Sequence, residues 1–142
     1  MENEKIKELA EFLGCDEEDI TVSNWNNRVF ELGNQEYLVV TDEEADEEAT
    51  SRIEEDIWAF KAKFILEACE IDYNETVISS LQEMQNRCCE SCNPFFLSLI
   101  ENTCGLDSFV QEAISCDGRG HFLASYDGHE KEAGCYYVYR MN

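Results

Sequence analysis

The sequence is poor in basic residues. Ten Lys and Arg stand against 32 Asp and Glu, which gives a net charge of −22 over 142 residues. The phosphates of nucleic acids would repel such a chain, and so would anionic membrane surfaces. We therefore expect it to bind neither directly. No stretch approaches 18 consecutive apolar residues, so no transmembrane helix is predicted.

The sequence also lacks the motifs of familiar enzyme classes. It contains no G-x-S-x-G, P-loop, HExxH or dinucleotide-binding fingerprint, so we expect a protein that is not an enzyme and has no cofactor. Its first residues, MENEK, form neither the basic nor the apolar region of a signal peptide. A cytoplasmic, reducing location is expected, in which the eight cysteines are thiols or metal ligands rather than disulfides.

With one proline and seven glycines, the sequence has no low-complexity linker and no visible domain boundary. Apolar residues make up 44% and aromatic residues 11%, which is enough for a core, since a domain of this size buries roughly two-thirds of its unfolded surface. We predict a single acidic α+β domain over residues 1–142. It should pack a small antiparallel sheet against a cluster of helices.

The order of the predicted elements follows from changes in hydrophobic period. Apolar residues recur at helical spacing over 4–13, and Gly14 follows at a C-cap position. β-forming residues then dominate 20–41, where two turn-forming pairs divide them into a three-stranded antiparallel meander. Thr41 or Asp42 should cap the next helix.

That helix is expected to run to about residue 69. Its second half, 58–66, is apolar on most of its circumference and should be the most buried segment of the chain. Further helices are predicted over 74–89, 94–103 and 106–115, followed by a hairpin of 122–126 with 136–140 that can join the meander.

Three internal segments and the C-terminal residues together carry a resemblance. They are NQEYLVVTDEEADEE, IEEDIWAFKAKFIL, DGRGHFLASYDG and the terminal YYVYRMN. The chain resembles, over most of 30–142, a family of small, acidic, functionally uncharacterised proteins encoded by phages and other bacterial mobile elements. The resemblance implies a bacterial cytoplasm and a phage-type context, and it transfers no functional residues. The cysteine-rich run 86–92 lies outside the likeness.

The most charged segment is the first part of the predicted long helix. Residues 42–56 hold nine acids and one arginine. As a helix they span about 22 Å, or roughly one net negative charge per 3 Å, within a factor of two of duplex DNA. Such a rod could imitate phosphates in a Lys/Arg-lined groove, or it could be an ordinary solvated helix face.

The candidate partner-binding residues are mostly carboxylates. They come from the helix, from the acidic run before the meander, and from a tryptophan in a predicted turn that would anchor an interface. The set is Asp42, Glu43, Glu44, Asp46, Glu47, Glu48, Glu54, Glu55, Asp16, Glu17, Glu18, Asp19 and Trp25.

Two other segments leave alternatives open. Cys89 and Cys92 form a C-x2-C knuckle that could bind zinc with Cys104 and Cys116, although these two do not form the usual second knuckle. Buried free thiols are the other interpretation. Residues 117–129 hold acid, base and nucleophile types, but their two Asp-Gly pairs are also typical of a hairpin with tight turns.

The leading functional hypothesis is a non-enzymatic, phage-type inhibitor of the anti-CRISPR or antirestriction kind. Its acidic helix would occupy the basic groove of a host nucleic-acid-processing enzyme. The main alternative is a small-molecule- or metal-binding accessory protein, with a site near His121 or the cluster of Cys88, Cys89 and Cys92. A third hypothesis is a hydrolase that uses 117–129.

Overall fold

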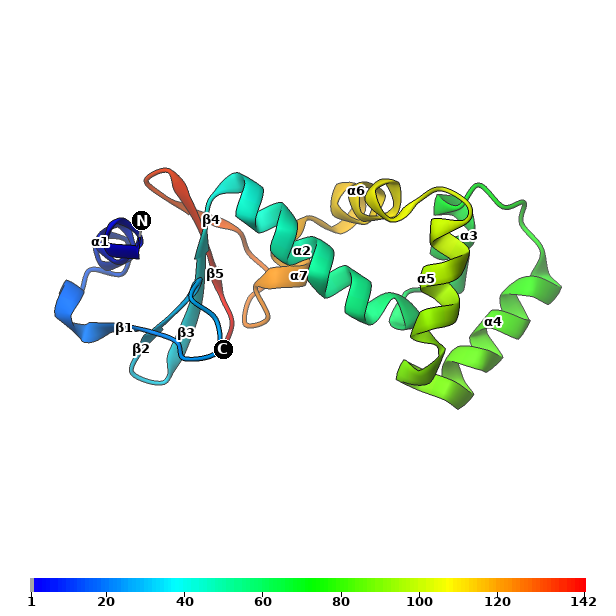
Figure 1. Cartoon of the computed structure of the whole chain (residues 1–142), viewed down its shortest axis with the longest axis horizontal. Coiled ribbons are helices and arrows are strands. Elements are labelled where there is room, and N and C mark those ends of the chain that lie inside the picture. The colour runs from blue at the N-terminus through cyan, green and yellow to red at the C-terminus, as the bar shows by residue number, and fades with distance from the viewer. Residues whose placement is uncertain (1) are drawn as a thin grey trace. The chain divides into compact units, whose positions relative to one another are not determined.

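The protein has an α+β fold, described by a computed structural model over residues 2–142 (Figure 1). It divides into two compact units. The first comprises the residues up to Ala49 together with Asp117–Asn142, and the second is Thr50–Cys116. Within the described residues, no helix is both long enough and apolar enough to cross a membrane.

The first unit is built on a five-stranded antiparallel sheet in the order β1-β2-β3-β5-β4. The strands are β1 (Ile20–Val22), β2 (Val29–Leu32), β3 (Gln35–Val40), β4 (Lys131–Ala133) and β5 (Tyr136–Arg140). The predicted meander over 20–41 is therefore confirmed. The prediction that 136–140 is a strand is confirmed too, and this strand joins the meander by pairing with β3.

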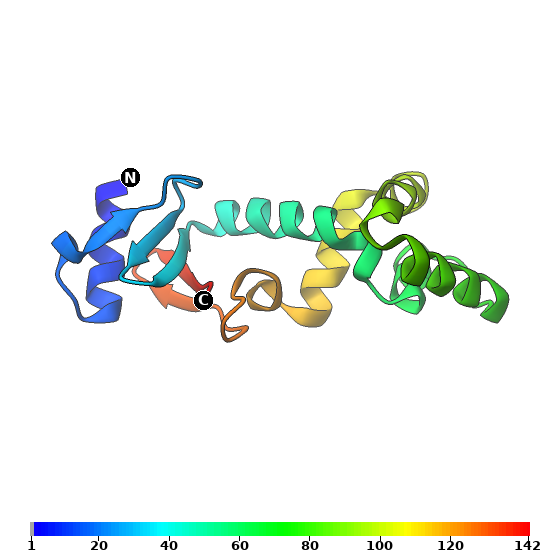
Figure 2. The same cartoon turned by 90° about the horizontal axis from the view of Figure 1, so that it is seen from below.

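Helices cover both faces of this sheet. On one face, α1 (Glu2–Leu13) packs Leu9 and Ala10 against alternate strand residues that include Tyr37, Val39 and Val138. Figure 2 shows this helix, in blue, against the sheet. On the other face, Figure 1 places α7 (Arg119–Leu123) and the beginning of α2 (Asp42–Asp56).

Burial on both faces explains why the sequence of β3 contains a continuous apolar run. Its last four residues are all buried, at 5% exposure or less. Leu38 lies opposite Val29 on one side and Tyr139 on the other. An alternating pattern is expected only where one face meets water, so the run Tyr-Leu-Val-Val marks the central strand.

Helix α2 begins with a capping box. The Thr41 hydroxyl accepts from the Glu44 amide at 3.2 Å, and the Glu44 carboxylate accepts from the Thr41 amide at 3.0 Å. Each interaction satisfies a backbone donor that the helix itself leaves unpaired. Of the two predicted capping residues, Thr41 therefore makes this reciprocal pair.

The second unit is helical. After the end of α2 come η2 (Ile57–Ala59), α3 (Ala62–Ala68), α4 (Glu75–Cys88), η3 (Cys89–Cys92), α5 (Asn93–Glu101) and α6 (Leu106–Asp117). The predicted helices over 74–89, 94–103 and 106–115 are confirmed within a few residues. The rings of Phe60, Phe64 and Phe109 form a cluster with centroids 5.4–5.8 Å apart.

The prediction of one helix from 42 to 69 is wrong. The helix breaks after Asp56, and Phe60 adopts an extended conformation. The Gln85 amide donates to the carbonyls of Trp58 and Phe60 at 2.8 and 2.6 Å, while the Asn93 amide oxygen accepts from the Trp58 backbone at 2.9 Å. These distant side chains satisfy the backbone groups that the break exposes.

The expectation that 58–66 is the most buried segment is also wrong. Only Ala62, Ile65 and Leu66 of these residues are buried, whereas Lys61 and Lys63 are exposed. The longest run of consecutive buried residues in the described part of the chain is 37–40, in β3. A central strand loses both faces to packing, whereas a short helix keeps one face in water.

The predicted strand over 122–126 is wrong as well. Residues 119–123 form α7, and β4 supplies the partner of β5, with Lys131 opposite Val138. The structure requires glycine at position 120, since a Cβ there would lie 2.6 Å from the Gly128 carbonyl oxygen and 2.8 Å from the Glu130 amide nitrogen. The close crossing of 128–130 over this helix depends on that missing side chain.

Candidate functional site

The carboxylates at the start of α2 are held by cations of the first unit. Arg28, in the loop before β2, lies 2.9 Å from Glu47, 3.4 Å from Glu44 and 3.9 Å from Glu48. Lys5 of α1, itself 5% exposed, lies 2.9 Å from Glu44. This end of the helix is therefore tied to two other elements of its unit.

Arg119 of α7 holds a second group of carboxylates. Its Nε lies 2.8 Å from Glu130, and its Nη1 lies 2.8 Å from Asp42 and 3.2 Å from Asp46. Glu130 also accepts from the Tyr139 hydroxyl. Burial and the bond to Glu130 raise the pKa of Tyr139 above its usual range, so this hydroxyl remains a donor.

Five of the six acids between 42 and 48 thus lie within 4.0 Å of a cation. Burial by itself would raise the pKa of the Glu44 carboxyl, but the Thr41 amide and the Lys5 ammonium outweigh burial and lower it. The sequence-based expectation was a helix whose first half projects free charge. The paired cations neutralise much of that charge within the fold.

The free carboxylates lie elsewhere. Asp16, Glu17, Glu18 and Asp19 are all exposed, in and beside the 3-10 helix η1 (Glu17–Asp19). In the described part of the chain no ion pair involves these four, and none involves Glu43, Glu54 or Glu55. Glu54 and Glu55 belong to the second unit.

Helix α1 adds to the charge beside η1. Residues 2–19 contain eight acids and two lysines, and Lys5 is already bound to Glu44. We define the N-terminal acidic surface as the seven exposed carboxylates of this stretch. They are Glu2, Glu4, Glu11, Asp16, Glu17, Glu18 and Asp19.

Trp25 lies in the loop between β1 and β2. It is 63% exposed, and its ring nitrogen donates to Glu36 at 3.3 Å. The Asn26 side chain of the same loop donates to Glu48 and accepts from the Arg28 amide. An exposed tryptophan on a loop held in this way can anchor a contact at low entropic cost.

The cysteines do not assemble into the zinc set considered from the sequence. Among residues 2–142, no three His, Cys, Asp or Glu side chains are grouped to hold a metal ion. Cys92 is buried and donates to the Cys89 carbonyl, and Cys116 is exposed at the end of α6. Cys104 lies instead beside Cys69, with the two sulfur atoms 4.0 Å apart.

The segment 117–129 contributes both to the ion pairs at the start of α2 and to the lining of a pocket. Arg119 organises the ion pairs described above, and Asp127 and His129 line a pocket. His121 is exposed, and its ring meets Phe122 edge-on with centroids 4.9 Å apart. His129 lines the pocket, whereas His121, which was singled out from the sequence, is not among its lining residues.

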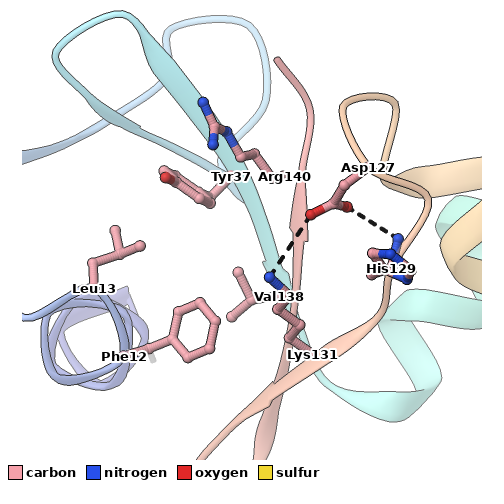
Figure 3. A pocket seen from close by; sticks show the side chains of 8 residues that line it. All are labelled: Phe12, Leu13, Tyr37, Asp127, His129, Lys131, Val138 and Arg140. Carbon is pink, nitrogen blue, oxygen red and sulfur yellow. Dashed lines mark hydrogen bonds and ion pairs between the residues drawn. The ribbon is translucent and has the colours of Figure 1, made fainter.

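This pocket has a volume of about 190 Å³ and lies entirely within the first unit (Figure 3). Phe12 and Leu13, at the end of α1, reach it from one side, and the loop carrying Asp127 and His129 reaches it from the other. The sheet face between them contributes the remaining lining residues, which are Tyr37, Lys131, Val138 and Arg140.

Sequence reasoning missed this pocket because its residues come from one helix, three strands and a loop. The one signal present was the alternation in β5, which places Val138 and Arg140 on the same face as Tyr37 of β3. Nothing in the sequence brings the end of α1 to that face. No protein-family model, curated protein or solved structure matches this chain.

Proposed function

We propose that the protein is a non-enzymatic, phage-type inhibitor that binds the basic groove of a host nucleic-acid-processing enzyme. Its carboxylates would occupy sites that normally hold phosphates. The observation that carries this proposal is the run Asp16–Asp19, in which four consecutive exposed carboxylates have no cation within 4.0 Å among the described residues.

The charge balance of the first unit supports the proposal. This unit contains 20 Asp and Glu but only six Lys and Arg. Three of those bases, Lys5, Arg28 and Arg119, already bind carboxylates around α2. Such an excess of negative charge speeds encounter with a basic surface and repels acidic competitors.

The N-terminal acidic surface, rather than the first turns of α2, is the leading contact in this proposal. Carboxylates at the start of α2 would have to leave Arg28 or Arg119 before binding a cation of the partner. The carboxylates of η1 have no such exchange to make. Trp25 would supply the apolar contact that charge alone does not give, since hot spots are enriched in tryptophan.

The partner would be identified by affinity capture from a bacterial lysate, followed by titration of the purified pair. The test variant replaces Asp16, Glu17, Glu18 and Asp19 by their amides. The control variant makes the same change in net charge at four scattered exposed carboxylates, Glu90, Glu101, Glu112 and Glu132.

We expect the test variant to bind at least about tenfold more weakly and the control variant to bind nearly as well as the wild type. Raising the salt from low to physiological concentration should weaken the wild-type complex, because exposed charges are screened beyond about 8 Å. Equal losses in both variants, or affinity that ignores salt, would overturn the proposal. So would a captured partner that still binds its nucleic acid when saturated with this protein.

A further inference from the structure

The pocket of Figure 3 is a basic spot on an acidic protein. Lys131 and Arg140 line it together with a single acid, Asp127. The charges of Lys131, Arg140 and Asp127 sum to one positive charge. This is the reverse of the chain as a whole, whose net charge is −22.

Arg140 keeps donors available for a ligand. Its guanidinium lies over the Tyr126 ring, 3.6 Å from the ring centroid, and its Nε donates to the Asn142 carbonyl at 2.8 Å. No carboxylate of the described residues lies within ion-pair distance of it. Arg28 and Arg119, by contrast, each bind three.

Lys131 and Asp127 make only a loose pair. Their charged atoms are 3.8 Å apart, and the other oxygen of Asp127 accepts from the His129 amide at 3.0 Å. That amide, followed by the Lys131 charge, lowers the pKa of Asp127. The carboxylate is thus held in the loop by the backbone, which leaves the ammonium free to turn to another anion.

The rest of the lining is apolar or aromatic. Val138 and Tyr37 are buried at 2% and 5% exposure and form the floor on the sheet, while Phe12 is 38% exposed at the rim. A volume of about 190 Å³ is below the roughly 300–1,000 Å³ typical of sites for drug-sized molecules. The ligand must therefore be small.

We propose that this pocket binds a small monocarboxylate with an apolar body. The carboxylate would lie against Arg140 and Lys131, because the guanidinium fork matches two carboxylate oxygens. The apolar body would lie against Phe12 and Val138. One net positive charge in the lining matches one negative charge on the ligand, so a dianion such as a phosphate monoester is less well matched.

Binding can be followed by amide chemical shifts of the whole ¹⁵N-labelled chain, at constant ionic strength. The probes are benzoate, its neutral analogue benzamide and its cationic analogue benzylamine. We expect benzoate to shift the amides of Lys131, Val138 and Arg140 with saturation near millimolar concentration, as suits so small a ligand. Benzamide should bind about tenfold more weakly or worse, and benzylamine should not saturate.

Variants separate this site from general charge attraction. Arg140→Met combined with Lys131→Met should lose at least about tenfold in benzoate affinity. The control, Arg87→Met with Lys63→Met, removes the same charge from exposed positions of the second unit and should bind as the wild type does. If the test variant does not fold, Phe12→Ser serves instead, and it should weaken benzoate and benzamide alike.

The proposal is overturned if benzoate fails to saturate, if benzoate and benzamide bind equally, or if the control variant loses as much affinity as the test variant. Tighter binding of phenyl phosphate than of benzoate would also overturn the assignment to a monocarboxylate. This proposal is independent of the proposed inhibitor function, because its test needs no protein partner.

Discussion

Arg119 binds Glu130, eleven residues further along the chain, with 2.8 Å between Nε and Oε1. The same guanidinium reaches Asp42 and Asp46 at the start of α2 and lies over the Tyr137 ring of β5, 4.9 Å from its centroid. One side chain therefore joins α7, α2 and the sheet of the first unit. Because the Arg119 side chain is largely buried, we expect this junction to stabilise the fold.

Replacing Arg119 by Met should destabilise the protein by about 2–3 kcal/mol, since a guanidinium only 12% exposed would be lost together with its hydrogen bonds to three carboxylates, of which Glu130 is the least exposed. Thermal unfolding should shift down by roughly 5–10 °C for a chain of this length. Arg87→Met is the matched control, because its pair with Glu83 lies on an exposed helix face and should contribute less than about 1 kcal/mol. Equal shifts in the two variants would contradict the role given to Arg119.

Glu44 should make stability depend on pH. Its pKa in the folded state lies below the ordinary value, so the folded state binds fewer protons than the unfolded one. The stabilisation is present above the unfolded pKa of about 4.3 and is lost as pH falls through the folded pKa. Glu44→Gln should therefore cost about 1–3 kcal/mol at neutral pH and much less near pH 3.

The control for that experiment is Glu43→Gln. Glu43 is exposed in the same helical turn, and no ion pair of the described residues involves it. Its effect on unfolding free energy should be small at every pH between 3 and 7. A Glu44 effect that stayed constant over this range would count against the ion pairs with Lys5 and Arg28.

Gly120→Ala should destabilise the protein, although alanine ordinarily favours a helix. The added methyl group would meet the Gly128 carbonyl oxygen at 2.6 Å, and backbone cannot move aside as a flexible side chain can. We expect a cost of about 1–3 kcal/mol, as for other overpacked sites, measured by denaturant unfolding. Ser125→Ala, at an exposed position of the following turn, should be nearly neutral.

The cysteine pair predicts a specific oxidation product. Reductant should leave the melting temperature unchanged, since all eight cysteines are free thiols. With oxidised glutathione, Cys104 and Cys69 should exchange into one intramolecular disulfide and release two molecules of reduced glutathione, because their sulfur atoms are 4.0 Å apart. Burial raises the pKa of Cys69, so the more accessible Cys104 should react first.

Peptide mapping by mass spectrometry would identify this bond. Cys104→Ser should abolish it, whereas Cys116→Ser, at an exposed position, should leave it unchanged. The closed loop of about 35 residues would raise stability by at most about 4 kcal/mol in the chain-entropy description. A mixture of disulfides dominated by other cysteines would show that proximity does not decide the product.

The sequence predicted most of the helices and strands better than it predicted their contacts. The meander could be predicted because turn-forming residue pairs separate runs of β-forming residues over 20–41. The helical spacing of apolar residues likewise predicted α4, α5 and α6. The break in the helix before Phe60 could not be predicted from the sequence, because the side-chain amides of Gln85 and Asn93 that stabilise it lie 25–35 residues away along the chain. The local sequence carries no information about partners that are so distant along the chain.

The acidic helix illustrates the same limit. Nine acids in fifteen residues predicted free charge, yet Arg28 and Arg119 neutralise much of it, and neither is near 42–48 in sequence. The pocket was hidden for a related reason, since Phe12 and Arg140 come from opposite ends of the chain. Composition gives the number of charges, and only the fold gives their partners.

The two edge strands of the sheet have a consequence for self-association. β1 and β4 are three residues long, and β4 begins with the exposed pair Lys131 and Glu132. A strand added from another molecule would find only a short ladder, with charged side chains beside it. The sheet is therefore a poor template for intermolecular β-pairing, and concentrated solutions of the protein should resist fibril growth through these edges.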